Sequence, residues 1–559
     1  MYTILLHKLL WKGKTLPIST RVNKFNKFSL EMAHVLVYFA LLLMQNYLSD
    51  VWKLSFTHAA GIMNIWGGIY RILPHFFLIS VDALLGNFLM LVLSSISYTL
   101  GISFITMSTP PVLANSTGTC KEYEPNCIGH TQRVLFYTGM ALVAVGMSGN
   151  SISVKPFLDE QYDIRTRPIL AVTLTLGVFV PIVGNFALPY INSWSLRFGI
   201  PAICMAFATL LFFTGSCAYN KETPKGSPFI SVCRVIVAFA FNICKPYPLD
   251  ANHLYRREGD EDQTFKCIRF LRCLKKAAIL TNPDDPDITK WKLCTVTEVE
   301  EAKFVVCMVP IWMNIIICGI VSSIGNTYFL EQANNMNRKI GKLNVPLPIL
   351  VLLYKGADDL IKFCAYRYLS TPNKVVALRG IAMAMVFSIL CCITAAIMET
   401  RRLNVIRSHD LLDKPDKDIP MSIYWLAFQF FLLIVLDSFF EQSVVAFYKD
   451  QAPDSMKNIL EKLTTAVTGL GYMCSVLSVY VVGKISEMGG RPNWFQFTLN
   501  RSRLDRYYWV LAGLSSVNLV VYILVAPFYR YKKPEASDAV EDDRETNELT
   551  NDIVQASCS

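Results

Sequence analysis

The sequence predicts an all-α membrane protein with about twelve membrane-spanning helices arranged in two halves of six. Hydrophobic residues make up 53% of the 559-residue chain and charged residues only 17%, a balance too apolar for a set of soluble domains. Apolar runs recur along almost the whole chain, each about 20 residues long, which is the length that a helix needs to cross a ~30 Å hydrocarbon core. We therefore expect an integral multi-pass membrane protein whose helices contact the lipid bilayer.

The N-terminal segment, residues 1–27, is basic and contains no acidic residue. Because basic segments stay on the cytoplasmic side of membranes, this terminus is expected to be cytoplasmic. The first long apolar run follows it and is interpreted as a retained span and not as a cleaved signal peptide. The net charge of +10 comes from short segments that flank apolar runs and not from one basic face, so no nucleic-acid partner is expected.

Twelve spans are expected along the chain. They are residues 28–48, 58–81, 84–107, 134–155, 168–191, 199–219, 304–328, 345–366, 376–398, 421–446, 458–484 and 506–530. We call 28–219 the first half and 304–530 the second half. Between them, 220–303 is expected to be a cytoplasmic linker whose apolar part, 229–242, lies along the membrane or packs on the bundle. The tail, 531–559, is polar and acidic and is expected to be disordered.

The expected topology can be compared with the loop sequences. Two Asn-x-Ser/Thr acceptors, at Asn115 and Asn500, fall on loops assigned to the exoplasmic side, which agrees with this topology; Asn500 is so close to the membrane that its modification stays open. The exoplasmic segment 399–420 is rich in Lys and Arg, which runs against the usual cytoplasmic bias of these residues. Cys120 and Cys127 share one polar loop, and the sequence leaves open whether they form a disulfide.

Four sequence blocks carry a resemblance to a known family. They are NIWGGIYRILPHFFLISVDALLG at 64–86, SLRFGIPAICMAFATLLFFTG at 195–215, KLCTVTEVEEAKFVVCMVPIW at 292–312 and FYKDQAPDSMKNILEKLTTAVTGLGY at 447–472. In their order and spacing they resemble the plant nitrate/peptide transporters, a branch of the proton-dependent oligopeptide transporters in the major facilitator superfamily. The resemblance extends from about residue 30 to 533 and implies the major facilitator superfamily fold, with alternating access to a midplane site between the halves.

The resemblance also implies proton-coupling residues in the first half. Family members carry Glu-x-x-Glu-Arg on the first helix, and here the corresponding residues are Glu31, His34 and Val35. Lys155, at the end of the fourth span, matches the family lysine that pairs with these carboxylates. We expect proton coupling at Glu31, His34 and Lys155, since an imidazole can titrate near neutral pH. The structural alternatives stay open: Lys155 could be an interfacial lysine, and His34 a packed core histidine.

The expected substrate-binding residues are Tyr38, Lys155, Ser322 and Asp437. Tyr38 matches a family position that faces the substrate cavity, and Ser322 stands where a nitrate-selective relative has a histidine. Asp437 stands where the family has a glutamate that binds the substrate amine in peptide-transporting relatives. A carboxylate deep in an apolar span is costly unless it faces a cavity or a partner, which favours function for Asp437, although a structural pair with Glu441 on the same helical face is the alternative.

The sequence therefore predicts a secondary active transporter, proton-linked or formerly so, for a small polar solute such as nitrate, a di- or tripeptide or a related plant metabolite. No metal, organic cofactor or enzymatic activity is expected, because no metal cluster, phosphate loop or nucleophile motif has recognisable spacing. The rival interpretation is a transport-deficient sensor or scaffold, because two of three residues of the proton motif are replaced. The plasma membrane and the vacuolar membrane both remain open, as does the oligomeric state.

Overall fold

The computed structural model describes most of the chain. The described residues are 18–109, 128–159, 184, 187–188, 190–216, 219, 228–243, 255, 269–279, 293–340, 343–344, 347–369, 374–415, 417–453 and 456–526. Within them, nine helical segments are long and apolar enough to cross a membrane. Most of the expected fifth span, the Cys120–Cys127 loop, Asn115 and the C-terminal tail lie outside the described residues.

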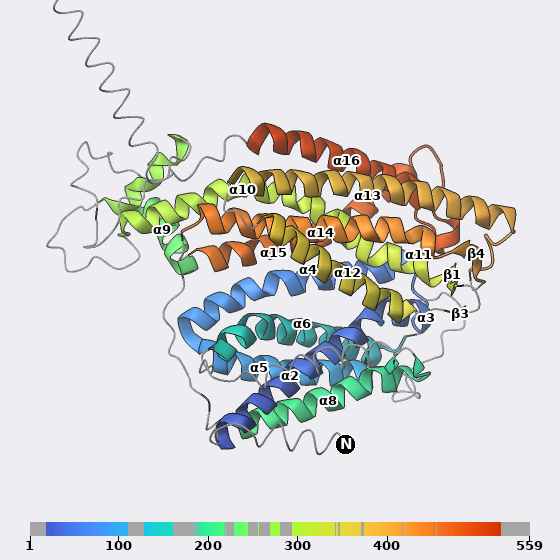
Figure 1. Cartoon of the computed structure of the whole chain (residues 1–559), viewed down its shortest axis with the longest axis horizontal. Coiled ribbons are helices and arrows are strands. Elements are labelled where there is room, and N and C mark those ends of the chain that lie inside the picture. Colours follow the sequence, from blue (N-terminus) through green and yellow to red (C-terminus); the bar gives the residue numbers. More distant parts are fainter. Residues whose placement is uncertain are drawn as a thin grey trace, which may run out of the picture. The chain divides into compact units, whose positions relative to one another are not determined.

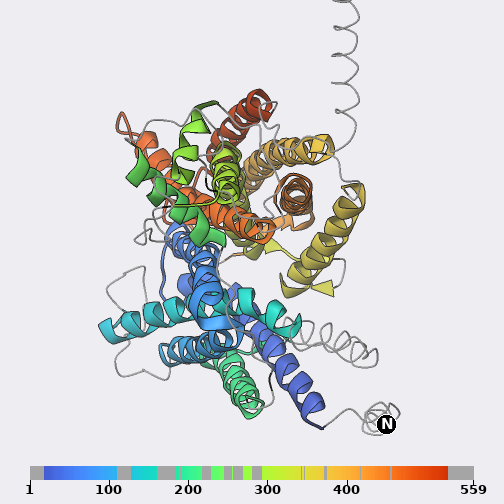
Figure 2. The same ribbon diagram turned by 90° about the vertical axis from the view of Figure 1, so that its left-hand side faces the viewer.

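The helices of the first half follow the apolar runs closely. They are α2 (Ile18–Leu42), α3 (Met44–Asp50), α4 (Phe56–Ser80), the π-helical turn η1 (Val81–Leu85), α5 (Gly86–Met107), α6 (His130–Asp159) and α8 (Trp194–Thr214). Helix α2 begins earlier than expected, within the basic N-terminal segment. In Figure 2 these helices, coloured blue to green, gather in the lower part of the bundle.

Small residues allow α5 and α6 to approach closely. A Cβ added to Gly101 would lie 2.9 Å from the carbonyl oxygen of Gly139, and one added to Gly146 would lie 2.5 Å from the Cβ of Tyr98. Backbones pack this tightly in membrane helices when the interface is lined by small residues, because lipid offers no hydrophobic driving force for association. Glycines therefore set the distance between these two helices.

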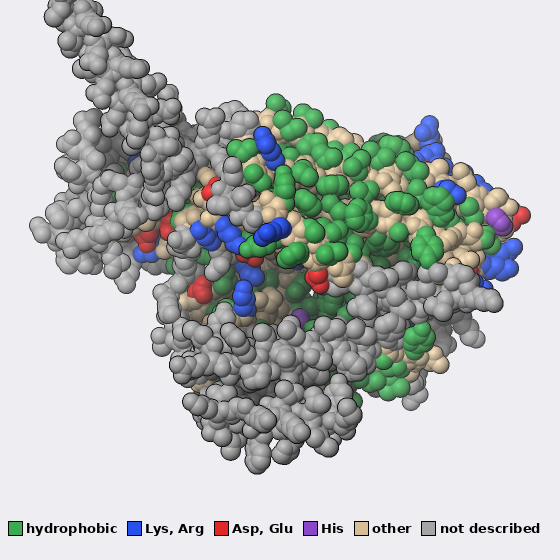
Figure 3. Space-filling view, in the orientation of Figure 1, with side chains coloured by type: hydrophobic (Ala, Val, Ile, Leu, Met, Phe, Trp, Pro, Cys, Tyr) green, Lys and Arg blue, Asp and Glu red, His purple; other side chains and the backbone are tan. Residues whose placement is uncertain are grey.

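The second half contains the longest described helix, which has 35 residues. The helices of this half are α10 (Val296–Ile324), the π-helical turn η5 (Gly325–Phe329), α11 (Leu330–Asn334), α12 (Leu347–Tyr368), α13 (Lys374–Ser408), α14 (Tyr424–Gln451), α15 (Lys457–Ser486), η6 (Leu499–Arg501) and α16 (Leu504–Val525). In Figure 1, α13, α14, α15 and α16 run in roughly the same direction. Their outer face is hydrophobic in Figure 3, with exposed Leu390 and Ile397 on α13 and Val517 and Leu524 on α16, as expected for contact with lipid.

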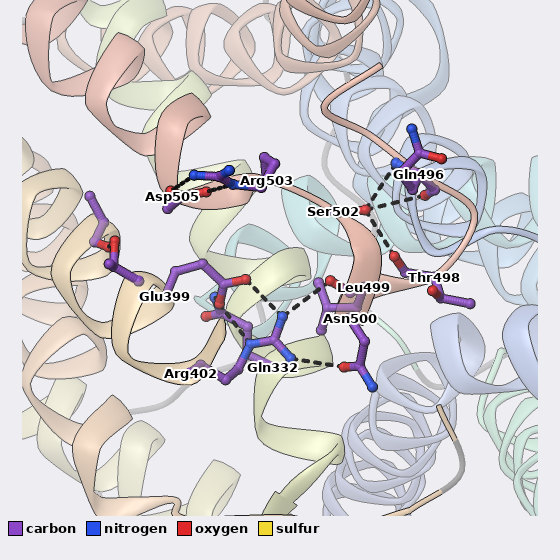
Figure 4. A network of polar contacts seen from close by, with 12 residues as sticks. Gln332, Glu399, Arg402, Gln496, Thr498, Leu499, Asn500, Ser502, Arg503 and Asp505 are labelled. Carbon is purple, nitrogen blue, oxygen red and sulfur yellow. Dashed lines mark hydrogen bonds and ion pairs between the residues drawn. The ribbon is translucent and has the colours of Figure 1, made fainter. Parts of the chain in front are cut away.

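A buried polar network joins α11, α13 and α14 to the segment before α16 (Figure 4). Arg402 donates two hydrogen bonds of 2.7 Å to Glu399, and a third, of 3.1 Å, to the side-chain oxygen of Asn500. Gln332 donates to Glu399 at 2.6 Å and accepts from Gln429 at 2.9 Å. Helix α13 continues to Ser408, into the segment 399–420 that follows the expected span. Arg402 is a buried, paired charge within this helix, which weakens the apparent conflict with the positive-inside rule.

Asn500 is buried, whereas a glycosylation acceptor needs an accessible side-chain amide. Its side chain is only 2% exposed, its oxygen accepts from Arg402, and its amide donates to the carbonyl of Leu411 at 3.2 Å. An oligosaccharide cannot be attached to a side chain that is enclosed and hydrogen-bonded at both ends. In the folded protein Asn500 is therefore not accessible for glycosylation, a question that the sequence left open.

Two short sheets lie beyond the ends of the helices. Strand β1 (Met336–Asn337) pairs in parallel with β4 (Ile419–Ser422), with an irregular register between its two residues. Strand β2 (Lys339–Ile340) pairs antiparallel with β3 (Leu343–Asn344). The parallel pair connects the segment after α11 to the segment before α14.

A second compact unit comprises 228–310, 447–457 and 523–559. Among its described residues it contains α9 (Pro228–Asn242), an apolar helix, and η4 (Arg269–Ala278), a basic 3₁₀ helix. Arg234 on α9 pairs with Glu298 at 2.7 Å, and Glu300 pairs with Lys303 at 2.6 Å. The expected linker therefore has its own ion pairs, while its contact with the membrane stays a prediction.

Candidate functional site

The centre of the candidate site is the carboxylate of Asp437 on α14. The local sequence FFLLIVLDSFF makes the helix apolar on both sides of this residue. Asp437 accepts a hydrogen bond of 3.2 Å from the hydroxyl of Ser322 on α10, a side chain that is itself buried. A carboxylate at this depth requires polar partners, because hydrocarbon offers none. The structure thus brings together the two second-half residues that the sequence singled out, Ser322 and Asp437.

The hydroxyl of Tyr472 on α15 extends this contact to two further side chains. It lies 3.3 Å from the hydroxyl of Ser322, and it receives hydrogen bonds from the Asn326 amide at 3.0 Å and from the Arg71 guanidinium at 3.1 Å. Asn326 lies in η5, where the helix widens by one residue per turn. π-Helical turns of this kind are frequent at functional sites.

Arg71 enters the site from α4 in the first half. It also donates a hydrogen bond of 3.0 Å to the carbonyl of Gly67, and the guanidinium carbon lies 3.9 Å from the centre of the Tyr472 ring. The close approach of α4 to α15 is set by glycine, because a Cβ on Gly68 would lie 2.8 Å from the carbonyl oxygen of Gly469. The polar cluster of Arg71, Ser322, Asn326, Asp437 and Tyr472, which we call the central cluster, therefore spans both halves.

A neighbouring group of charges lies on α12 and α14. Lys362 pairs with Glu441 at 2.8 Å and with Asp358 at 3.4 Å, and Ser438 donates to Asp358 at 2.9 Å. The sequence left open a structural pair between Asp437 and Glu441. In the structure Glu441 pairs with Lys362 instead, and Asp437 accepts from Ser322. The carboxylates of α14 thus have separate partners.

The expected first-half residues are not joined into one cluster by the described contacts. His34 packs edge-on against Tyr98 with ring centroids 5.4 Å apart, and its buried Nδ1 has no hydrogen-bond partner within the described chain. Tyr38 is 46% exposed and lies beside Phe39. Lys155 is exposed near the end of α6. Glu31 lies in α2, but its side chain is outside the described residues, so the proton-coupling set stays a prediction.

Sequence reasoning missed Arg71, Asn326, Tyr472 and Lys362. A signal existed for Arg71, because an arginine inside an apolar run of membrane-spanning length is itself unusual. The same holds for Lys362, within the expected span 345–366. Nothing comparable marks Asn326 or Tyr472, since both residue types are common in packed helices. Within the described residues, no group of three or more His, Cys, Asp or Glu side chains is arranged to hold a metal ion.

Comparisons with known proteins agree with the sequence resemblance. The model of the POT family matches residues 88–495. "Protein NRT1/ PTR FAMILY 5.5" of Arabidopsis thaliana is 34% identical over 539 residues, which is 92% of this chain and 98% of the relative. "Protein NRT1/ PTR FAMILY 5.6" of the same plant is 28% identical, with 92% and 91% covered.

Solved structures show the same fold at low sequence identity. The in meso crystal structure of the POT family transporter PepTSo has a TM-score of 0.61 at 15% identity, covering 92% of this chain and 99% of that one. A POT family transporter in complex with 5-aminolevulinic acid has a TM-score of 0.56 at 9% identity, covering 91% and 96%. These similarities confirm the predicted fold class, an all-α membrane protein with the major facilitator superfamily fold.

Proposed function

Because the chain belongs to the POT family of membrane transporters, we propose that it is a secondary active transporter that couples movement of a small polar solute to protons. The observation that carries this proposal is the contact of Asp437 with Ser322 and, through Tyr472, with Arg71. Four helices from both halves meet there. A site of this kind changes its surroundings when the halves move, which is what a transporter requires.

Alternating access is supported by contacts between the halves at one end of the bundle. Gln45 on α3 donates to the carbonyl of Thr327 and to the carboxylate of Glu331, each at 3.3 Å, and Asn334 donates to Asn46 at 2.9 Å. These are a few neutral or singly charged hydrogen bonds, each contributing about 0.5–1.5 kcal/mol net. Contacts of this strength can open and close, so we propose that the first half rocks against the second.

We propose that Asp437 exchanges the coupling proton. An ionised carboxylate repels an anion and attracts an amine, and protonation removes both effects because the carboxyl group becomes neutral. Proton binding and solute binding at one site would then be linked by charge alone. The alternative candidates for proton exchange are Glu31, His34 and Lys155 in the first half, which the resemblance to the family implies.

The solute class follows from the charges of the central cluster. The guanidinium of Arg71 can bind an anionic group, and the carboxylate of Asp437 can bind an amine. We therefore propose a solute that carries an anionic group, an amine or both. A solved relative holds 5-aminolevulinic acid, which carries an amine and a carboxylate. We propose that nitrate, a short peptide or a related plant metabolite is carried, in the plasma or vacuolar membrane; a fluorescent fusion would distinguish these locations.

The test is uptake by the purified full-length protein in liposomes with and without an inward proton gradient. A screen of nitrate, dialanine and other short peptides is expected to find a solute that accumulates only with the gradient. Asp437→Asn should abolish the dependence on the gradient, while Asp413→Asn, which changes an exposed carboxylate outside the cluster, should leave it intact. Gradient dependence that persists in Asp437→Asn would move proton coupling to another residue, and signalling without flux would favour the sensor.

A further inference from the structure

Arg71 is the least explained charge in the membrane-spanning part of the molecule. It lies in the apolar run GIYRILPHFF of α4. Placing an arginine in the middle of a membrane helix is unfavourable unless the side chain faces a cavity or a partner. Packing alone does not require a cation here, because leucine or methionine would fill the same volume at lower cost.

Within the described residues, no carboxylate lies within ion-pair distance of Arg71. Its two hydrogen bonds go to uncharged acceptors, the carbonyl of Gly67 and the hydroxyl of Tyr472. A guanidinium has five N–H donors in a planar fork, so donors remain for another acceptor. Arg402 differs from Arg71 in this respect, because two of its N–H groups donate to the carboxylate of Glu399.

The guanidinium is also held in position before any ligand binds. It lies over the Tyr472 ring at 3.9 Å, a distance typical of a cation–π contact. Gly67 makes room for it, since a Cβ at this position would be 3.3 Å from the Arg71 Nη1. A fork fixed in this way loses little conformational freedom on binding, which favours affinity for planar oxyanions.

We propose that Arg71, with the hydroxyl of Tyr472, forms an anion-binding subsite that holds a carboxylate or another oxyanion group of the transported solute. The proposal rests on the transport function proposed above and assigns to α4 a role that the family resemblance gives to Lys155. Asp437 lies on the other side of the Tyr472 and Ser322 hydroxyls. A solute with an amine as well as an oxyanion therefore spans from Arg71 to Asp437, and a solute with no anionic group binds weakly.

The test is equilibrium binding to the purified full-length protein at fixed pH, with matched probes. Dialanine carries a carboxylate and its methyl ester does not; nitrate and succinate serve as small oxyanions. The wild-type protein is expected to bind dialanine at least about tenfold more tightly than the ester, a difference of about 1.4 kcal/mol. In Arg71→Gln this ratio should fall close to one, because the cation proposed to bind the carboxylate is removed and the ester does not use it.

Three comparison variants separate the subsite from a structural role. Tyr472→Phe keeps the ring and removes one hydroxyl. It should therefore reduce the preference for dialanine over its ester less than Arg71→Gln does. Arg501→Gln changes an exposed arginine outside the cluster and should leave the ratio unchanged. Equal loss of both probes in Arg71→Gln would show that Arg71 only joins α4 to α15 and would overturn the proposal. Loss of the ratio in Lys155→Gln but not in Arg71→Gln would also overturn it.

Failure of the subsite and failure of the transport function give different results. If uptake is not proton-driven but Arg71→Gln removes the preference for the carboxylate, the subsite stands and proton coupling fails. If uptake is proton-driven but Arg71→Gln binds dialanine as the wild type does, the subsite alone fails. Absence of saturable binding for dialanine, nitrate and succinate in the wild type would overturn the subsite as an oxyanion site.

Discussion

The guanidinium of Arg402 makes two hydrogen bonds of 2.7 Å with the carboxylate of Glu399, one helical turn earlier, and both side chains are about 1% exposed. A pair buried in this way is sensitive to the loss of one partner, because the remaining charge has no water to replace it. The ion pair of Arg501 with Asp413 is exposed instead, with side chains that are 59% and 70% exposed. The two pairs therefore form a matched comparison.

Arg402→Met should destabilise the folded protein by about 3–5 kcal/mol, because Glu399 would be left buried without its cation. Arg501→Met should cost less than about 1 kcal/mol, since exposed pairs contribute little. Melting temperatures of the detergent-purified proteins, followed by size-exclusion chromatography after heating, measure both. Similar melting temperatures for the two variants would show that the buried network does not stabilise the bundle.

Gly146→Ala should lower stability by about 1–3 kcal/mol, the usual cost of adding a methyl group to a packed core. The added Cβ would lie 2.7 Å from both the Cα and the backbone nitrogen of Tyr98, so α5 and α6 would have to separate. Gly513→Ala is the control, because nothing lies within 4 Å of its Cβ position on α16. The yield of monodisperse protein and its melting temperature give the readout; an unchanged Gly146→Ala protein would mean that α5 can shift freely.

Asn500 should not be glycosylated, since its side chain is enclosed and bonded to Arg402 and Leu411. The protein expressed in plant or insect cells is treated with an endoglycosidase, and the wild type is compared with Asn500→Gln and Asn115→Gln. We expect Asn500→Gln to lose the same mass on endoglycosidase treatment as the wild type. If the loop containing Asn115 is exoplasmic, Asn115→Gln should remove this loss of mass. Loss of a sugar in Asn500→Gln would require the segment before α16 to stay open until after modification.

Much of the fold could be predicted because the bilayer imposes one length on every span. The expected 58–81 corresponds to α4 (Phe56–Ser80), and 458–484 to α15 (Lys457–Ser486). Features that depend on contacts between distant segments could not be predicted. The β1–β4 pairing joins Met336 to Ile419 with no local pattern to mark it, and the burial of Asn500 depends on an arginine almost a hundred residues away.

The candidate site was predicted in part. Asp437 and Ser322 were found because the family resemblance marks their positions, and Asp437 also because a carboxylate is unusual in an apolar run. Arg71 meets the same physical criterion, but the charged residues that the family resemblance implies in the first half lie on the first and fourth spans. The position of Tyr472 between Arg71 and Ser322 results from the packing of α4 on α15 at Gly68 and Gly469, which a single sequence does not reveal.

The last prediction concerns the contacts that hold the halves together at the ends of α3 and α11. Gln45 donates to Thr327 and Glu331, and Asn46 accepts from Asn334. The double variant Gln45→Ala, Asn46→Ala removes all three bonds. At about 0.5–1.5 kcal/mol each, their loss should shift the equilibrium toward the state open at this end by about tenfold or more.

This end is exoplasmic under the expected topology, so the shift can be measured from outside. A cysteine introduced at Asn64, a buried residue that bonds Thr327 at 3.4 Å, should be alkylated by an impermeant maleimide faster in the double variant than in a protein carrying the cysteine alone. Asn493→Ala is the matched control, because it removes an amide whose bond to Glu487 stays within the second half. It should leave the alkylation rate unchanged. If the double variant is alkylated no faster, the contacts of Gln45 and Asn46 do not limit opening, and the closing force lies elsewhere, with the packing of Phe56 on Tyr328 as the next contact to change.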